Sequence, residues 1–148
     1  MLNDKWNTRF LDMAALVASW SKDPSTKTGA VIVGPDKRVI ATGYNGFPAS
    51  MPDGPELYNN RAEKYSRIVH CEINAVLYAP SPLPTGAILY TWPFISCDRC
   101  VVQMLQAGIK NFVAPLPSEE ALSRWAESFN RTRQYIKECG GILKEVSY

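Results

Sequence analysis

Two short segments of the chain contain residues whose types and spacing suit metal chemistry. Residues 70–72 read His-Cys-Glu, and residues 97–100 read Cys-Asp-Arg-Cys. One imidazole and two thiolates form a nitrogen and sulfur set that suits zinc, and three protein ligands leave the fourth tetrahedral position open for water. An open position is typical of a catalytic metal site. The spacing therefore predicts a catalytic zinc centre with His70, Cys97 and Cys100 as its ligands.

Glu72 lies two positions after His70, where we expect it to reach an activated water without coordinating the metal. Zinc lowers the pKa of water from about 15.7 towards 7, which supplies hydroxide at neutral pH. As a general base Glu72 would take a proton from that water, and as a general acid it would pass the proton to a ring nitrogen and then to a departing amine. A carboxylate suits this role because one group must accept and then donate a proton within each turnover.

Each motif also has an ordinary explanation. A single Cys-x-x-Cys is often a redox pair or half of a structural zinc site, and a lone histidine packs and hydrogen-bonds more often than it binds a metal. A thioredoxin-like site would use Cys97 and Cys100 but would leave His70 and Glu72 without a role. Cys71 is an alternative ligand to His70, although its position directly beside Glu72 favours the histidine. The combination of both motifs favours catalysis.

Hydrophobic periodicity and breaker residues predict the elements that carry these motifs. We expect helices over residues 4–20, from about 70 to the prolines that begin at 80, from about 97 to 108, and over 118–139. We expect strands over residues 29–34, 38–43, 87–92, 111–114 and 142–146, the first two as a hairpin. Residues 44–58 contain three prolines and two glycines, which predicts a long shaped loop. The alternation of strand and helix predicts an α/β fold with a mixed, mostly parallel sheet of five strands and helices on both faces.

Composition argues against several classes of protein. The chain has 148 residues with 16 basic and 14 acidic side chains, hence a formal net charge of +2, and no polybasic block. This balance does not favour a polynucleotide or a membrane surface as partner. No apolar run approaches the roughly 18 residues of a spanning helix, and the N-terminus lacks the apolar core of a signal peptide. We therefore expect a single cytoplasmic domain over residues 1–148, whose four cysteines are free or bind metal.

The two motifs together resemble the zinc-dependent cytidine deaminase superfamily, in which the glutamate is acid and base and not a ligand. Residues 21–33 (SKDPSTKTGAVIV), 43–48 (GYNGFP) and 106–110 (QAGIK) resemble its deoxycytidylate (dCMP) deaminase branch. The resemblance covers residues 10–114. It implies a three-layer α/β/α cytidine deaminase-like fold, a Zn²⁺ cofactor, and hydrolytic deamination of dCMP to dUMP with release of ammonia, which supplies dUMP for thymidylate synthesis. It also implies a homo-oligomer, hexamer or dimer, and dCTP and dTTP as effectors.

Two positions depart from the pattern of the family near the expected base. Ser96 stands where a proline usually precedes the first cysteine, and Cys71 stands where an alanine usually separates histidine and glutamate. By resemblance, the backbone N–H of Cys71 bonds a carbonyl of the base. Asn45 is by residue type either a bidentate reader of sugar or base or a turn residue before a glycine, and the resemblance implies a contact with the sugar.

The remaining candidates for substrate binding are cationic, hydroxylic or aromatic. Ser25 and Lys22 belong to a polar strip after the first helix that suits phosphate. A solvent-exposed helix end explains these polar residues equally well. Arg61 and Lys64 are weaker alternatives for the phosphate. Of the aromatic residues, those that lie close to Cys97 in sequence are the candidates for stacking on a pyrimidine, and Trp125 is not among them. These candidates are Tyr90, Trp92 and Phe94, although core packing is the commoner role for most such residues.

The nearest alternative functions are deaminases of other cytosine compounds, such as the free base, a nucleoside, dCTP or a 5-modified dCMP. A base within a polynucleotide is less favoured because it requires a basic channel. A different class is a structural zinc module for protein interaction. Metal removal distinguishes the two classes, because a structural site loses its fold whereas a catalytic site loses activity first.

Overall fold

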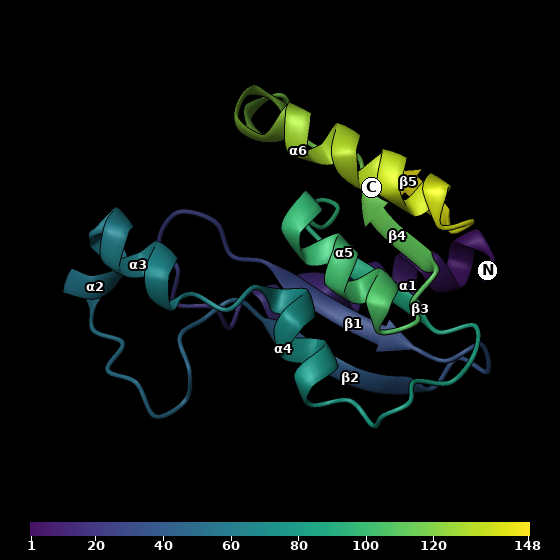
Figure 1. The fold of residues 1–148 in the computed structure, drawn as a ribbon, viewed down its shortest axis with the longest axis horizontal. Helices are drawn as coiled ribbons and strands as arrows, with labels where there is room; N and C mark the ends of the chain where they lie inside the picture. The colour runs from purple at the N-terminus through teal and green to yellow at the C-terminus, as the bar shows by residue number, and fades with distance from the viewer.

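The computed structural model describes residues 1–148, which form helices and strands in the expected order (Figure 1). Their bounds are α1 (Asp4–Ala18), β1 (Gly29–Val33), β2 (Val39–Tyr44), α2 (Pro55–Asn59), α3 (Arg61–Arg67), α4 (Cys71–Leu77), β3 (Ile88–Trp92), α5 (Asp98–Gln106), β4 (Asn111–Pro115), α6 (Glu119–Glu138) and β5 (Ile142–Val146). All five strands and four helices expected from periodicity are present, and their ends differ only by the usual one or two residues. No helix combines the length and the apolar character needed to cross a membrane.

The five strands form one sheet in the order β2-β1-β3-β4-β5. β1 is antiparallel to both β2 and β3, whereas the pairs β3–β4 and β4–β5 are parallel. The expected mixed sheet is confirmed. The expectation of mostly parallel pairing is wrong, because β1 lies inside the sheet and runs against both of its neighbours, so antiparallel and parallel pairings are equal in number.

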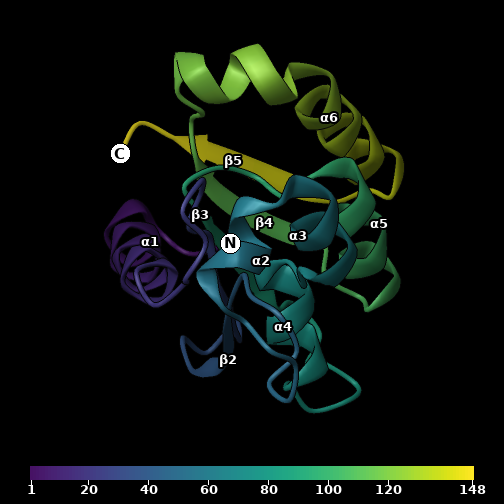
Figure 2. The same cartoon turned by 90° about the vertical axis from the view of Figure 1, so that its left-hand side faces the viewer.

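Helices cover both faces of this sheet. β1 is buried along its whole length because alternate side chains enter two different cores. Ala30 and Ile32 join the core that includes residues of α4 and α5, whereas Val31 and Val33 join the core formed with α1. The end-on view shows α1 on one side of the sheet and α4 and α5 on the other (Figure 2). The three-layer α/β/α arrangement is therefore confirmed.

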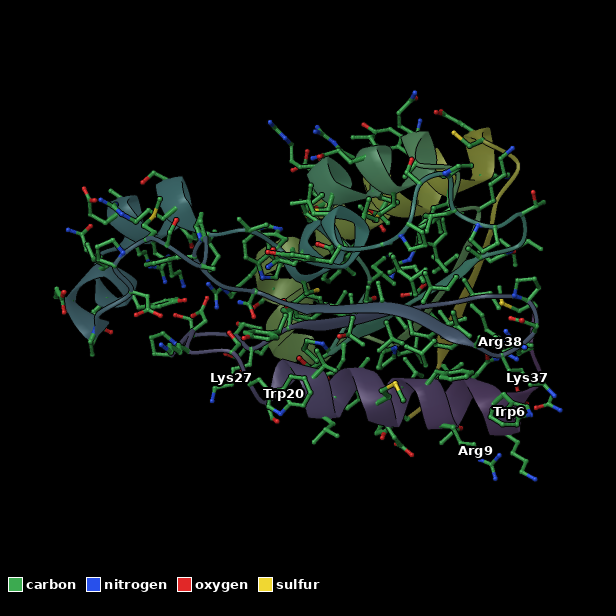
Figure 3. The ribbon with its side chains drawn as sticks, turned by 90° about the horizontal axis from the view of Figure 1, so that it is seen from below. Trp6, Arg9, Trp20, Lys27, Lys37 and Arg38 are labelled. Atoms are coloured by element: carbon green, nitrogen blue, oxygen red, sulfur yellow. The ribbon has the colours of Figure 1, made fainter.

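α1 is fixed at its N-terminal end by polar and aromatic contacts. The side chain of Asn3 accepts a hydrogen bond from the backbone N–H of Trp6 and so caps the helix. The Trp6 ring centroid lies 4.6 Å from the guanidinium carbon of Arg9 and 4.8 Å from the amine of Lys37 in the β1–β2 turn (Figure 3). These cation–π contacts join the hairpin turn to the start of the helix.

The segment between β2 and α4 contains two short helices, α2 and α3, that the sequence pattern does not predict. Pro55 is compatible with α2 because it occupies the first turn, where a missing N–H costs no helical hydrogen bond. Asn60 follows α2 and caps α3 by accepting a hydrogen bond from the N–H of Glu63. Residues 45–54 remain irregular, as expected. In Figure 1 the two helices project from one end of the sheet.

Candidate active site and metal centre

The three predicted metal ligands lie at the N-terminal ends of two helices. His70 immediately precedes α4, Cys97 immediately precedes α5, and Cys100 lies in the first turn of α5. A bridge between Gly46 and Val69 fixes the backbone before the histidine through hydrogen bonds of 3.1 and 2.8 Å. The partial positive charge at the start of a helix favours thiolates there. The local chain therefore holds both cysteines in a setting that suits metal binding.

The ligand atoms of this triad lie close enough together to share one ion. The Nδ1 of His70 is 3.1 Å from the Sγ of Cys100 and 3.7 Å from the Sγ of Cys97, and one ligand atom from each residue lies within 4.8 Å of the others. Tetrahedral zinc with ordinary Zn–N and Zn–S bonds separates such atoms by about 3.6 Å. The donor set and its spacing therefore fit zinc. The His70 side chain is 48% exposed, which leaves access for water beside the triad.

The three ligands influence one another's protonation. A hydrogen bond from the Cys100 thiol lowers the pKa of Cys97 to about 4, and the same contact raises the pKa of Cys100. A hydrogen bond with Cys97 raises the pKa of His70. Because zinc requires both thiolates and a neutral imidazole, binding of the ion by this triad would require Cys100 to lose its proton.

Glu72 lies beside the triad with its side chain only 5% exposed. Its Oε2 accepts a hydrogen bond of 3.0 Å from the hydroxyl of Ser96, and the thiol of Cys71 donates to the same oxygen at 3.5 Å. Its Oε1 is 3.8 Å from the Nδ1 of His70, and the carboxylate is not part of the metal-ligand group. One oxygen is thus held by protein donors while the other lies near the metal position, as a proton carrier requires.

The side chains of Ser96 and Cys71 both donate hydrogen bonds to Glu72. Both residues line the pocket, as expected of substrate-binding positions, but they are only 5% and 2% exposed. Burial raises the pKa of the Cys71 thiol well above its ordinary value, so this thiol remains a neutral donor. Both departures from the family pattern therefore bear on the orientation of the glutamate, and a contact of either residue with the base stays a prediction.

The side chain of Asn45 makes three hydrogen bonds within the protein. Its side-chain N–H groups donate to the Oδ2 of Asp23 at 3.3 Å and to the carbonyl of Thr26 at 2.9 Å. Its Oδ1 accepts the N–H of Thr28 at 2.8 Å. A bidentate reading of sugar or base is therefore excluded, and one lone pair of Oδ1 remains for a sugar hydroxyl. Asp23 in turn pairs with the amine of Lys64 at 3.1 Å.

The structure separates the two residues predicted to bind phosphate. Ser25 lines the pocket. Lys22 does not line it: its side chain is 65% exposed and its amine lies 2.6 Å from the Oδ2 of Asp53. The hydrogen bond with Asp53 also raises the pKa of Lys22. A carboxylate of the proline-rich segment thus pairs with the Lys22 amine outside the pocket, and a contact of Lys22 with substrate stays a prediction.

One pocket joins these groups and extends to α6. It is lined by His70 and Cys97 of the metal triad, by Glu72, by the loop before β1, by α3, by the segment after β3 and by three residues of α6. Trp92 and Phe94 line it as expected, whereas Tyr90 is fully buried elsewhere in the core. The residues from α6 are Arg124, Trp125 and Phe129, which are distant from the motifs in sequence. Sequence proximity to the cysteines therefore did not identify every aromatic residue of the pocket.

The sequence matches the family described as "Cytidine and deoxycytidylate deaminase zinc-binding region" over residues 4–115. The chain belongs to this family. Membership makes the protein a hydrolytic deaminase with zinc as its cofactor, and the triad described above is the group of residues able to bind that ion. The resemblance seen in the motifs is confirmed.

Similar proteins include other deaminases. An "Uncharacterized deaminase in luxG 3'region" of Aliivibrio fischeri is 38% identical over 136 residues, which cover 92% of this chain and 90% of that protein. Deoxycytidylate deaminase of Mus musculus is 34% identical over 114 residues, 74% of this chain but only 64% of the mouse protein. The crystal structure of dCMP deaminase from the cyanophage S-TIM5 with dCMP and dUMP is 18% identical, with a TM-score of 0.73 over 99% of this chain and 100% of that chain. The last comparison confirms the deaminase fold.

α6 lies outside the matched residues but supports the metal loop of this deaminase. Thr132 donates a hydrogen bond of 2.8 Å to the carbonyl of Ser96. The Ser128 hydroxyl accepts the N–H of Asp98 at 3.0 Å and donates to its Oδ1 at 2.8 Å. One signal for this role was present in the sequence, because Thr132 is a polar residue on the buried stripe of α6 beside Phe129.

Proposed function

We propose that the protein catalyses the hydrolytic, zinc-dependent deamination of dCMP to dUMP with release of ammonia. The observation that carries this proposal is the Glu72 carboxylate, held by one oxygen next to a metal triad whose His70 and Cys97 line the same pocket. Similarity to the deoxycytidylate deaminases of Mus musculus and Homo sapiens, at 34% and 33% identity, supports dCMP as the substrate. So does the likeness in fold to a phage enzyme whose structure was solved with dCMP and dUMP.

Glu72 is the residue that carries protons in this reaction. Zinc, when bound by the triad, supplies an activated water at neutral pH. The Oε1 of Glu72 removes a proton from the water and delivers it to N3 of the cytosine ring as the oxygen adds to C4. It then transfers the second proton to the amino group, so the C4–N bond breaks and ammonia leaves. Ser96 holds the other carboxylate oxygen, which keeps Oε1 directed at the reacting atoms.

The pocket walls suit a nucleoside next to these groups. Trp92 and Phe94 offer aromatic surface for a pyrimidine ring. Asn45 has one free acceptor position, which suits a sugar hydroxyl as donor.

A substrate panel tests the proposal. Zinc-loaded protein is assayed for ammonia release with dCMP, dCTP, 5-methyl-dCMP, deoxycytidine and cytosine, each with and without dCTP and dTTP as effectors. We expect the highest kcat/KM with dCMP. Absence of turnover with dCMP contradicts the proposal, and turnover of another compound alone assigns the enzyme to that substrate instead.

A substitution of the glutamate tests the mechanism. Glu72→Gln keeps the shape but cannot carry a proton, so we expect kcat to fall by about 10²–10⁴-fold while the zinc content, measured by metal analysis, stays unchanged. Glu120→Gln is the matched control, because Glu120 is an exposed glutamate of α6 outside the pocket. Retained activity in Glu72→Gln refutes the assigned role.

Several expectations stay predictions of the sequence. They are a single deaminase domain over residues 1–148, a homo-oligomeric assembly, and dCTP and dTTP as effectors. A cytoplasmic location also stays a prediction, and the four free cysteines support it. Chromatography with light scattering, together with the effector arms of the substrate panel, tests the assembly and the regulation.

A further inference from the structure

The pocket contains one cationic side chain that has no acidic partner and no hydrogen bond within the protein. Lys64 is paired with Asp23, and His70 belongs to the metal triad. Arg124 makes no ion pair and no side-chain hydrogen bond, and its guanidinium carbon lies 5.6 Å from the ring centroid of Trp125. The aromatic neighbour favours a guanidinium without neutralising it. The pocket therefore presents a free positive charge at the α6 side.

Two hydroxyl groups of the pocket are also free of protein partners. Ser25 and Thr26 line the pocket, and neither side-chain oxygen makes a hydrogen bond within the chain. The position of this loop is nevertheless fixed, because the N–H of Ser25 donates to the Oδ1 of Asp23 at 2.8 Å. A guanidinium and hydroxyls held on a rigid frame are groups that bind phosphate oxygens.

We propose that Arg124, with the hydroxyls of Ser25 and Thr26, binds the 5′-phosphate of a nucleoside monophosphate. Arg124 is then the residue that makes this deaminase select nucleotides over nucleosides. The inference rests on the proposed function for the identity of the base, and it adds the group that recognises the phosphate. Arginine suits this role because its planar fork forms two parallel hydrogen bonds to one phosphate.

Other basic residues near the pocket do not compete for this role. Lys22 is held by Asp53 and, like Arg61, does not line the pocket. The charge of Lys64 is offset by Asp23 at 3.1 Å. A phosphate beside that pair would meet a carboxylate as well as an amine. Arg124 is the pocket cation without an acidic partner.

Binding of the product and of its nucleoside tests this proposal without requiring turnover. Calorimetric titrations compare dUMP with deoxyuridine on zinc-loaded wild type, Arg124→Ala and Arg124→Lys. Lys137→Ala is the matched control, because it removes a cation from the same helix away from the pocket. We expect Arg124→Ala to weaken dUMP binding by about 10- to 100-fold, as for a lost hydrogen bond to a charged group, and to leave deoxyuridine binding unchanged. We expect the dUMP affinity of Arg124→Lys to lie between those of wild type and Arg124→Ala, because lysine keeps the positive charge but lacks the planar guanidinium.

Two results overturn the inference. One is wild-type protein that binds dUMP no more tightly than deoxyuridine, and the other is Arg124→Ala that keeps the wild-type preference for dUMP. Failure of the proposed function gives a different pattern, namely absence of dCMP turnover by wild type whatever the binding data show. Where dCMP is turned over, the expected kinetic signature of Arg124→Ala is a raised KM with kcat nearly unchanged, whereas a general folding defect lowers the active fraction and therefore kcat.

Discussion

Replacing Lys64 by methionine measures how strongly one buried ion pair ties the projecting helices to the pocket. The Lys64 amine lies 3.1 Å from the Oδ1 of Asp23, and the two side chains are only 8% and 6% exposed. Lys64 belongs to α3, whereas Asp23 belongs to the loop before β1, which lines the pocket. Methionine keeps most of the apolar stem and removes the charge, so the Asp23 carboxylate stays buried without its cation.

The expected cost follows from the burial of the pair. Removing one partner of a buried ion pair costs about 3–5 kcal/mol because the remaining charge is uncompensated. Asp23 keeps hydrogen bonds from the N–H of Ser25 at 2.8 Å and from the Asn45 side chain at 3.3 Å. These donors stabilise the lone carboxylate, so we expect a loss at the low end, about 3 kcal/mol in the free energy of unfolding.

The exposed pair of the same chemistry provides the control. Lys22 and Asp53 lie 2.6 Å apart with side chains 65% and 45% exposed, so solvent screens the pair and we expect its loss to change the stability little. Urea unfolding of wild type, Lys64→Met and Lys22→Met, followed by circular dichroism, gives the three free energies. A loss in Lys64→Met no larger than that in Lys22→Met refutes the reasoning, because burial would then confer no additional strength on the pair.

Three further predictions concern the glutamate, a buried tyrosine and the metal. Ser96→Ala removes the donor to the Oε2 of Glu72, so we expect kcat to fall about 10-fold at unchanged zinc content; wild-type kcat would contradict the positioning role. Burial raises the pKa of Tyr90 to about 12 from 10.0, so its contribution to stability is full below pH 10.0 and is lost as the pH rises through 12. We expect the unfolding free energy of Tyr90→Phe, measured across that pH range, to lack this alkaline loss. Equal pH slopes for wild type and Tyr90→Phe would contradict the prediction. A chelator is expected to abolish activity while circular dichroism stays native, because neither core on the sheet faces includes a metal ligand; unfolding on chelation would instead indicate a structural metal.

The metal centre was predictable because its chemistry is carried by short-range spacing. His70 and Glu72 are two positions apart, and Cys97 and Cys100 are three apart. The residue types and the predicted starts of two helices are therefore enough to identify the metal ligands and the glutamate. The supporting contacts were not predictable in the same way. Lys64 meets Asp23 across 41 positions, and periodicity reports only that a residue is buried, not which distant group it meets.

The fold shows the same division between local and distant information. Short β-branched runs on either side of a Pro-Asp-Lys turn predict the β1–β2 hairpin, since both strands lie close in sequence. The insertion of β1 beside β3 depends on a pairing between distant segments, for which the local pattern contains no signal. α2 and α3 are short helices rich in polar residues, and Pro55 resembles a breaker unless its place at the start of a helix is known.

The hydrogen bonds from α6 to the cysteine loop also bear on how the protein is made. Ser96 and Asp98 are held by Thr132 and Ser128, residues that a ribosome adds well after both cysteine ligands. During synthesis the cysteine pair therefore leaves the ribosome before the helix that shapes its loop. We expect zinc to be acquired with full affinity only after α6 has docked, which makes metal loading a late event in the biogenesis of this enzyme.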